Sequence, residues 1–184
     1  MLDRKSTGVI FVDIQGTLAN IIEQTEPFIA NTVMLYKGAK VLGLPTVVLE
    51  QMPHKLGATT GALSQCFDPL QTIISKHHFN ACHEPAFIKE LQNPAITDWL
   101  VCGIEAHICV YQTIVGMLET QRVKPQSVQV VLDAIGSRSG ANKQLAINKL
   151  GASGVQFTST EMCLYELTQD AQSDDFKEIL AIIK

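Results

Sequence analysis

Three polar residues follow short apolar runs of this chain and carry side chains used in acid–base and nucleophilic chemistry. Asp13 ends the run GVIFVD, Lys76 ends QTIISK, and Cys109 comes one short turn after DWLVCGI. If the runs are parallel strands of one open sheet, their carboxyl ends share an edge, where an acid, an ammonium and a thiol could meet in one crevice. The carboxylate could then take the thiol proton, and the thiolate could attack a carbonyl carbon.

Each of the three also has an ordinary structural interpretation. An aspartate after a strand often caps the next turn, a lysine there is usually solvated, and a cysteine early in a helix is more often a packing residue. The position of Cys109 favours chemistry, because the positive end of a helix dipole and a nearby Lys76 would both lower the pKa of its thiol. We therefore expect a nucleophilic Cys109 with a lowered pKa, served by Asp13 as proton acceptor.

The apolar runs that would place these residues are rich in Val, Ile and Leu rather than strictly alternating. This composition is typical of parallel strands covered on both faces. The sequence predicts strands at 8–13, 45–51, 71–76, 98–104, 127–134 and 155–160.

Helical patterns lie between the runs, at 26–42, 106–121 and 139–150, the last with Gly151 as its C-terminal cap. A final helix is expected after Ser173 as N-cap, with acidic residues in its first turn and an apolar stripe. The alternation predicts a Rossmann-like three-layer α/β/α fold with a mostly parallel sheet of about six strands. The loop at 51–69 follows a strand, so we expect it over the carboxyl edge, as a lid or as an ordinary surface loop.

Composition limits the class of protein. The 184 residues suit one domain, 1–184, and 46% hydrophobic residues suit an extensive core. The net charge of -4, with no basic run, argues against a nucleic-acid or membrane partner and favours a small molecule or a second copy. Five scattered cysteines and a short apolar N-terminal stretch lead us to expect a cytoplasmic protein with reduced thiols.

Four stretches make the sequence resemble the isochorismatase-like, or cysteine-hydrolase, superfamily along essentially its whole length. It is most similar to the isochorismatase domain-containing hydrolases, whose substrates are undefined. The stretches are VIFVDIQ (9–15), SKHHF with Lys76, VCGIEAHICV (101–110) and DAIGSRS (133–139).

The resemblance implies a catalytic triad of Asp13, Lys76 and Cys109, and a non-proline cis peptide at Ile104-Glu105. It also implies an oxyanion hole made by the backbone amides of Glu105 and Cys109. The implied activity is cofactor-independent hydrolysis of a small amide-like C–N substrate through a Cys thioester. Relatives are commonly oligomeric, so a homo-oligomer is expected.

Several positions depart from the pattern of relatives. Nicotinamidase-like members have an Asp-x-His metal motif after the second strand, whereas LEQMPHKLG lacks that spacing, and we expect no metal. The HHFNACH run (77–83) is also not expected to bind zinc, because adjacent histidines point apart. As candidate substrate-binding residues we take Gln15, Gln51, Phe79 and His107, although Gln15 could equally hold a loop and His107 a backbone carbonyl.

Alternative functions stay open at this point. The chain could be a binding or interaction protein that retains the fold, or an isochorismatase-type hydrolase of a vinyl ether, although a thiol nucleophile argues for acyl chemistry. A redox thiol is a further alternative, but no CxxC pair supplies a resolving partner.

Overall fold

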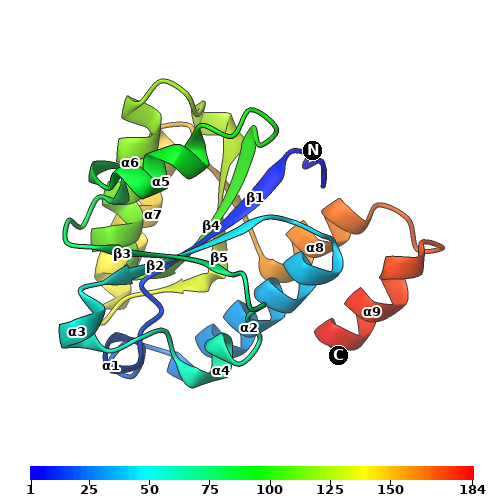
Figure 1. Cartoon of the computed structure of the whole chain (residues 1–184), viewed down its shortest axis with the longest axis horizontal. Coiled ribbons are helices and arrows are strands. Elements are labelled where there is room, and N and C mark those ends of the chain that lie inside the picture. Colours follow the sequence, from blue (N-terminus) through cyan, green and yellow to red (C-terminus); the bar gives the residue numbers. More distant parts are fainter.

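The six apolar runs pair side by side into one sheet in which every neighbouring pair of strands is parallel (Figure 1). This computed structural model describes residues 1–184. The order across the sheet is β3-β2-β1-β4-β5-β6. The strands are β1 (Thr7–Val12), β2 (Thr46–Gln51), β3 (Thr72–Lys76), β4 (Asp98–Ile104), β5 (Val128–Gly136) and β6 (Gln156–Thr158).

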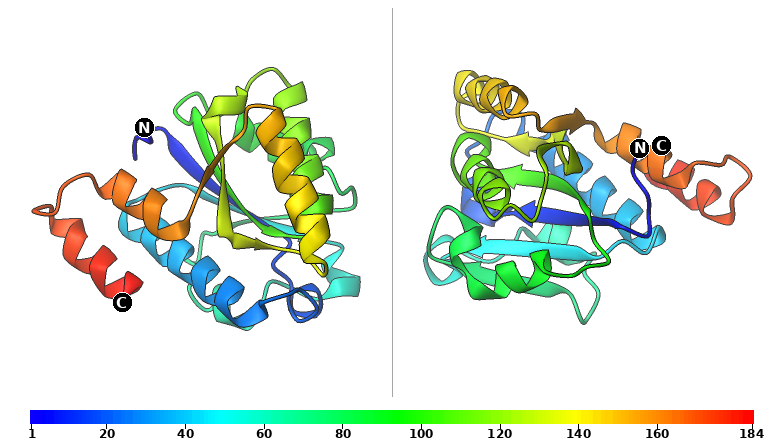
Figure 2. Two further views of the ribbon diagram at one scale, coloured as in Figure 1. Left: turned by 180° about the vertical axis from the view of Figure 1, so that it is seen from behind. Right: turned by 90° about the horizontal axis from the view of Figure 1, so that it is seen from above.

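Helices cover both faces of the sheet, with α2, α8 and α9 on one face and α5, α6 and α7 on the other (Figure 2). Short helical turns fill several of the connections. The helices are α1 (Gly16–Ala19), α2 (Thr25–Val41), α3 (Pro53–Leu56), α4 (Gly61–Ser64), α5 (Pro85–Leu91), α6 (Tyr111–Glu119), α7 (Gly140–Ala152), α8 (Thr160–Thr168) and α9 (Asp174–Ile183), with 3-10 turns η1 (Ala81–His83) and η3 (Pro125–Ser127) and a π turn η2 (Ala106–Val110). None of these helices has the length and apolar composition needed to cross a lipid bilayer.

Alternate residues of β1 enter two separate hydrophobic cores. Val9 and Phe11 pack with α2, α8 and α9, whereas Ile10 and Val12 pack with α5, α6 and α7. All four side chains are fully buried. A strand covered on both sides has no polar face, which explains the continuous apolar runs. The predicted three-layer α/β/α fold is confirmed.

Some predicted boundaries were wrong. The sequence analysis missed α5 and α8, and the strand expected at 155–160 ends at Thr158. The chain leaves the sheet there because the Ser159 side chain accepts a hydrogen bond from the Met162 amide and caps α8. The helix expected at 106–121 begins as the π turn η2 and continues as α6.

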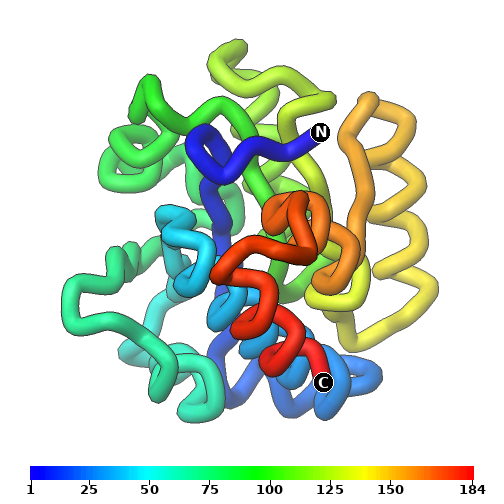
Figure 3. Tube along the Cα trace, turned by 90° about the vertical axis from the view of Figure 1, so that its right-hand side faces the viewer, coloured from blue at the N-terminus to red at the C-terminus, as the bar shows by residue number.

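Both predicted caps also differ from the structure. Ser173 precedes α9, but its side chain makes no capping hydrogen bond, and its hydroxyl oxygen is buried without a partner. Gly151 lies inside α7, and Gly154, with φ +85, is the residue that takes the left-handed conformation after that helix. Helix α9 lies beside α2 and α8 (Figure 3). Its Ile179 side chain is fully buried.

The direction of chain progression reverses between β1 and β4. From β1 the chain moves outward to β2 and β3, and from β4 it moves outward the other way to β5 and β6. The connections therefore diverge above these two strands and leave a crevice at their carboxyl ends. Val12 and Gly103 are register partners at that point.

Gly103 permits an unusually close approach of β4 to β1. Its φ is +123, and a Cβ built on it would lie 2.0 Å from the Val12 carbonyl oxygen. That oxygen belongs to the backbone and cannot rotate away, so only glycine fits there.

Replacing Gly103 by alanine should therefore damage the fold more than the same change at another left-handed glycine. Gly43 is the matched control, because its φ is +68 but a Cβ there meets nothing within 4 Å. We expect G43A to lower the free energy of unfolding by about 1 kcal/mol through backbone strain alone. G103A should lower it by more than about 4 kcal/mol or prevent folding. Urea denaturation measures both, and equal losses would contradict the close-packing interpretation.

Candidate active site

Asp13 is the first residue after β1 and has a left-handed backbone, with φ 51. Its amide donates a hydrogen bond to the Leu49 carbonyl of β2, which fixes the backbone where the strand ends. The residue is 0% exposed. A carboxylate buried this deeply requires a partner charge nearby.

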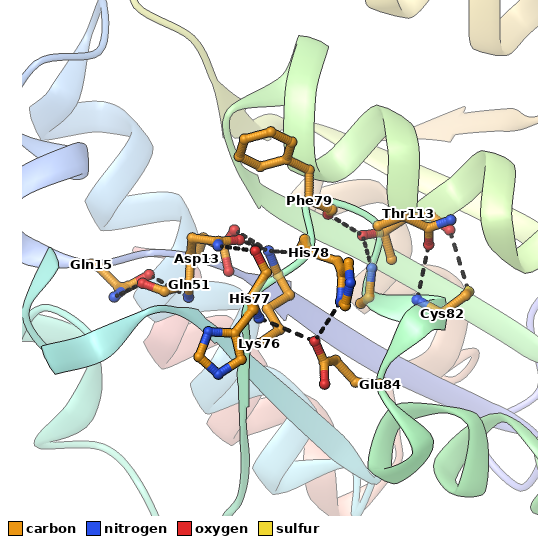
Figure 4. Close-up of polar contacts among 12 residues, drawn as sticks. Asp13, Gln15, Gln51, Lys76, His77, His78, Phe79, Cys82, Glu84 and Thr113 are labelled. Carbon is orange, nitrogen blue, oxygen red and sulfur yellow. Dashed lines mark hydrogen bonds and ion pairs between the residues drawn. The ribbon is translucent and has the colours of Figure 1, made fainter. Parts of the chain in front are cut away.

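Lys76, the last residue of β3, supplies that charge from two strands away. Its ammonium lies 2.8 Å from Asp13 Oδ2, 2.7 Å from Gln51 Oε1 and 3.2 Å from the His78 carbonyl oxygen. The three N–H groups therefore match three acceptors (Figure 4). Lys76 is also 0% exposed, so the ion pair lies entirely in the interior.

The second oxygen of Asp13 has no such partner. Oδ1 is buried and has no hydrogen-bond partner of good geometry. Burial raises the pKa of this carboxyl, while the charge of Lys76 opposes the rise. One carboxylate oxygen is therefore not held by the ammonium, and the neighbouring Cys109 thiol, which helps to lower the pKa of this carboxyl, is close enough to interact with it.

The thiol of Cys109 lies beside this carboxylate, close enough that the two groups shift each other's pKa. Cys109 belongs to the π turn η2 and is 6% exposed, so of the three groups it is the one that reaches solvent. The structure therefore brings the three predicted residues together from the end of β1, the end of β3 and the π turn η2.

The expectation of a lowered thiol pKa was wrong. Burial raises the pKa of Cys109 to about 12, the negative charge of Asp13 adds to the rise, and Lys76 only partly opposes it. The resting thiol is consequently protonated, and it needs a base before it can act as a nucleophile.

The segment before Cys109 is held by a charged side chain. The Ile104–Glu105 peptide is cis, and the backbone N–H of Glu105 has no backbone acceptor. The Glu105 carboxylate accepts the Arg138 backbone N–H at 3.0 Å and lies 2.8 Å from Arg138 Nε. These contacts fasten the segment to the end of β5.

The tentative substrate-binding residues fall into two groups. Gln51 and Gln15 are buried and bound to the protein: Gln51 joins Lys76 to the His77 carbonyl, and the Gln15 amide binds the Gln51 backbone and the Gly57 carbonyl. The phenyl ring of Phe79 is exposed. Gln15 therefore has the loop-holding role that the sequence analysis had kept as its alternative, and contact with substrate stays a prediction for all these residues.

His107 points toward the end of β5. Its Nδ1 lies 3.0 Å from Ser137 Oγ and 3.9 Å from Glu105 Oε2, and its side chain is partly exposed. In the HHFNACH run, His78 Nδ1 lies 3.1 Å from Glu84 Oε1. No three His, Cys, Asp or Glu side chains come together at metal-binding spacing.

Two contributors to the site were missed by the sequence analysis. The His78 carbonyl binds Lys76, but a backbone oxygen leaves no signal in a sequence. Thr113 holds the segment after Lys76, and its position four residues after Cys109, on the same side of a helix, could have identified it.

Glu50, which lies in the LEQMPHKLG stretch, holds a neighbouring loop. Its Oε1 accepts hydrogen bonds from the Thr59 amide at 2.7 Å and the Thr59 hydroxyl at 2.8 Å. Together with Gln15, it fixes the connection between α3 and α4 beside the end of β1.

The chain is similar to known proteins along most of its length. The isochorismatase domain model matches residues 7–162. Isochorismatase domain-containing protein 2 of Danio rerio is 30% identical, over 99% of this chain and 89% of its own length. A ribonuclease structure from Caenorhabditis elegans, named MAR1, superposes with a TM-score of 0.91 at 28% identity, over 99% of this chain and 91% of that one. The YcaC gene product of Escherichia coli, described as an octameric hydrolase of unknown specificity, superposes with a TM-score of 0.90 at 22% identity, over 98% and 89%.

Removing the ammonium should make stability depend on pH. In Lys76→Met the Asp13 carboxyl stays buried without its partner, so its pKa rises further above that of the unfolded chain. At pH values between the pKa of Asp13 in the unfolded chain and its pKa in the folded variant, the folded state binds one more proton than the unfolded state. The free energy of unfolding therefore falls as pH rises, by up to about 1.4 kcal/mol per pH unit. We expect K76M to be far less stable than the native protein at pH 8, by about 3–5 kcal/mol, and closer to it at pH 5.

Urea denaturation across this pH range measures the effect, with D13N/K76M as the control. The double variant has no carboxyl to titrate at this site, so its difference from the native protein should not grow with pH. A K76M deficit that is the same at pH 5 and pH 8 would show that Asp13 is not the group responsible.

Proposed function

The chain belongs to the isochorismatase domain family, whose fold is of hydrolase type, and from that premise we propose that it is a cysteine hydrolase. Its substrate is a small molecule with an amide-like C–N bond, and no cofactor is needed. Cys109 is the nucleophile, Asp13 the general base and acid, and Lys76 the group that holds the carboxylate in place.

The observation that carries this proposal is the uneven use of the Asp13 carboxylate. Oδ2 is bound to Lys76 at 2.8 Å, whereas Oδ1 is buried without a partner in a carboxyl whose pKa is raised by burial. A purely structural ion pair would have both oxygens hydrogen-bonded, since a buried orphan acceptor is unfavourable. A free, basic oxygen next to a thiol with a pKa of about 12 is suited to take its proton.

The catalytic cycle follows from that arrangement. As the sulfur of Cys109 bonds to the carbonyl carbon, its proton passes to Asp13. The tetrahedral intermediate collapses, the C–N bond breaks, and Asp13 returns the proton to the departing ammonia or amine. Asp13 then takes a proton from water, whose oxygen attacks the thioester. The carboxylic acid is released as the C–S bond breaks, and Asp13 returns the proton to the departing sulfur, which restores the thiol and the carboxylate.

The developing oxyanion needs donors, and we assign this role to the backbone amides of Glu105 and Cys109. The Glu105 N–H, which lacks a backbone acceptor, supports the assignment, as does the anchoring of its side chain by Arg138. Each preorganised donor contributes about 3 kcal/mol to such a transition state.

The site favours acyl chemistry over the alternatives. Adding water to a vinyl ether requires an acid and gives the Cys109 thiol no task. Hydrolysis of RNA, the activity named for the Caenorhabditis elegans neighbour, is not favoured, because the chain carries net charge -4 and the Lys76 ammonium is saturated by three acceptors. A non-catalytic binding protein would have no use for the free oxygen of Asp13.

We also propose that the protein is a homo-oligomer and that it is cytoplasmic. The octameric Escherichia coli neighbour supports a homo-oligomer. Two large apolar residues are exposed at the edge of the sheet: Leu70, just before β3, is 94% exposed, and Ile73, in β3, is 47% exposed. Apolar surface of this kind is often covered in an assembly. The five unpaired cysteines support a reducing, cytoplasmic setting.

Covalent trapping tests the hydrolase proposal. Native protein is mixed with a library of small amides, ureides and hydroxamates, and acyl adducts are detected by intact mass. At least one compound should give an adduct on Cys109 and be turned over. Cys109→Ala should keep the fold but lose both, with turnover falling by at least about a thousandfold.

Cys66→Ala is the matched control, since that thiol lies outside the site and should not affect either readout. Turnover that survives in C109A would refute the nucleophile. Native protein that binds compounds without adduct or turnover would favour the binding-protein alternative.

A further inference from the structure

The segment that follows Lys76 does not run freely to α5 but is fixed to the helix that follows Cys109. This connecting segment, residues 77–83, crosses from the end of β3 to α6 (Figure 4). There the Thr113 hydroxyl accepts the Ala81 N–H at 3.2 Å and donates to the Phe79 carbonyl at 3.3 Å. Thr113 is 0% exposed, so these bonds are made in the interior.

The other end of the connecting segment is bound to the catalytic lysine itself. The His78 carbonyl accepts a hydrogen bond from Lys76 Nζ at 3.2 Å, and the His77 carbonyl accepts one from Gln51 Nε2 at 2.8 Å. One of the three acceptors that orient the ammonium is therefore a backbone atom of this segment, only one residue before the Phe79 carbonyl held by Thr113.

A close approach next to Thr113 fixes the segment further. A Cβ built on Gly116 would lie 2.3 Å from Asn80 Oδ1, so the Asn80 side chain occupies the space that glycine leaves open. The same Oδ1 accepts the Cys82 N–H at 2.9 Å. The turn η1 is thus seated directly on α6, within about two helical turns of Cys109.

From these contacts we infer that Thr113 is a positioning residue, which sets where the Lys76 ammonium lies relative to the Cys109 thiol by holding the connecting segment against α6. The inference rests on the proposed function for its meaning, because Lys76 and Cys109 are the groups it aligns. Thr113 itself is hydrogen-bonded to neither of them and acts through the His78 carbonyl.

The chemistry of the hydroxyl explains why threonine suits this position. A hydroxyl can accept and donate at the same time, and the connecting segment presents one N–H and one carbonyl to it. Serine would keep both bonds. Valine has nearly the same shape but would leave the Ala81 N–H and the Phe79 carbonyl without partners, and the segment would move to satisfy them.

Alkylation of Cys109 by iodoacetamide provides a test that needs no substrate. Lys76 lowers the pKa of this thiol, so a displaced ammonium leaves less thiolate at any fixed pH below the thiol pKa. Rates are followed between pH 8 and 10 by mass spectrometry of the Cys109 peptide. We expect Thr113→Val to slow alkylation by about threefold or more, equivalent to about half a pH unit in the thiol pKa, and Thr113→Ser to restore the native rate.

The matched control is Thr32→Val. Thr32 is also 0% exposed and donates to a helical carbonyl, that of Phe28 at 2.7 Å, but it lies in α2 on the opposite face of the sheet. T32V should lower the melting temperature without changing the alkylation rate. If T113V does not fold, Asn80→Ala replaces it, since it loosens the same segment and should slow alkylation in the same direction.

A double-mutant cycle separates positioning from general loosening. In the D13N/K76M background, which has no buried carboxyl to titrate, the change to valine at residue 113 should have no further effect, because there is no ammonium left to misplace. Alkylation that is unchanged or faster in T113V, or equally slowed with and without Lys76, would overturn the inference. Failure of the hydrolase proposal would appear in a different experiment, as native protein that forms no acyl adducts. The alkylation rates of native protein and T113V could still be compared in that case.

Discussion

The buried ion pair between Asp13 and Lys76 is the interaction on which the rest of the site depends. Both side chains are fully inaccessible to solvent, so each charge has lost its hydration and must be balanced by the other. Such a pair is favourable only when the remaining donors and acceptors are also satisfied. The lysine meets that condition through Gln51 and the His78 carbonyl. The aspartate does not, because its Oδ1 accepts no hydrogen bond of good geometry. This oxygen is therefore the atom of the ion pair that is available to accept a proton.

The strand order explains how Asp13, Lys76 and Cys109 come together, although Lys76 is 63 positions after Asp13 and Cys109 is 33 positions after Lys76. Because β1 and β4 are neighbours, the residues that follow them, Asp13 and the turn with Cys109, lie at the same edge of the sheet. Lys76 comes from the outer strand β3 and extends past the end of β2, where Gln51 receives it. The absence of a side chain at Gly103 lets the two central strands approach closely there.

In the proposed function, the Cys109 thiol stays neutral until substrate binds. Burial and the neighbouring carboxylate both disfavour the thiolate, so proton transfer to Asp13 and bond formation to carbon are expected to be coupled. This arrangement differs from a thiolate held by a cation in the resting state. It also protects the sulfur from adventitious oxidation, which proceeds through the thiolate.

The α/β class, the parallel sheet and the three polar residues at strand ends could be predicted from the sequence, because strands buried on both faces impose apolar runs and the polar residues that follow such runs stand out. The sequence analysis misjudged α8 and the Ser173 cap, since these depend on which side chains face one another across the fold. Only the tertiary structure decided the pKa of Cys109, the free oxygen of Asp13 and the role of Thr113. These properties depend on burial and on distances between segments remote in sequence, and linear spacing contains neither.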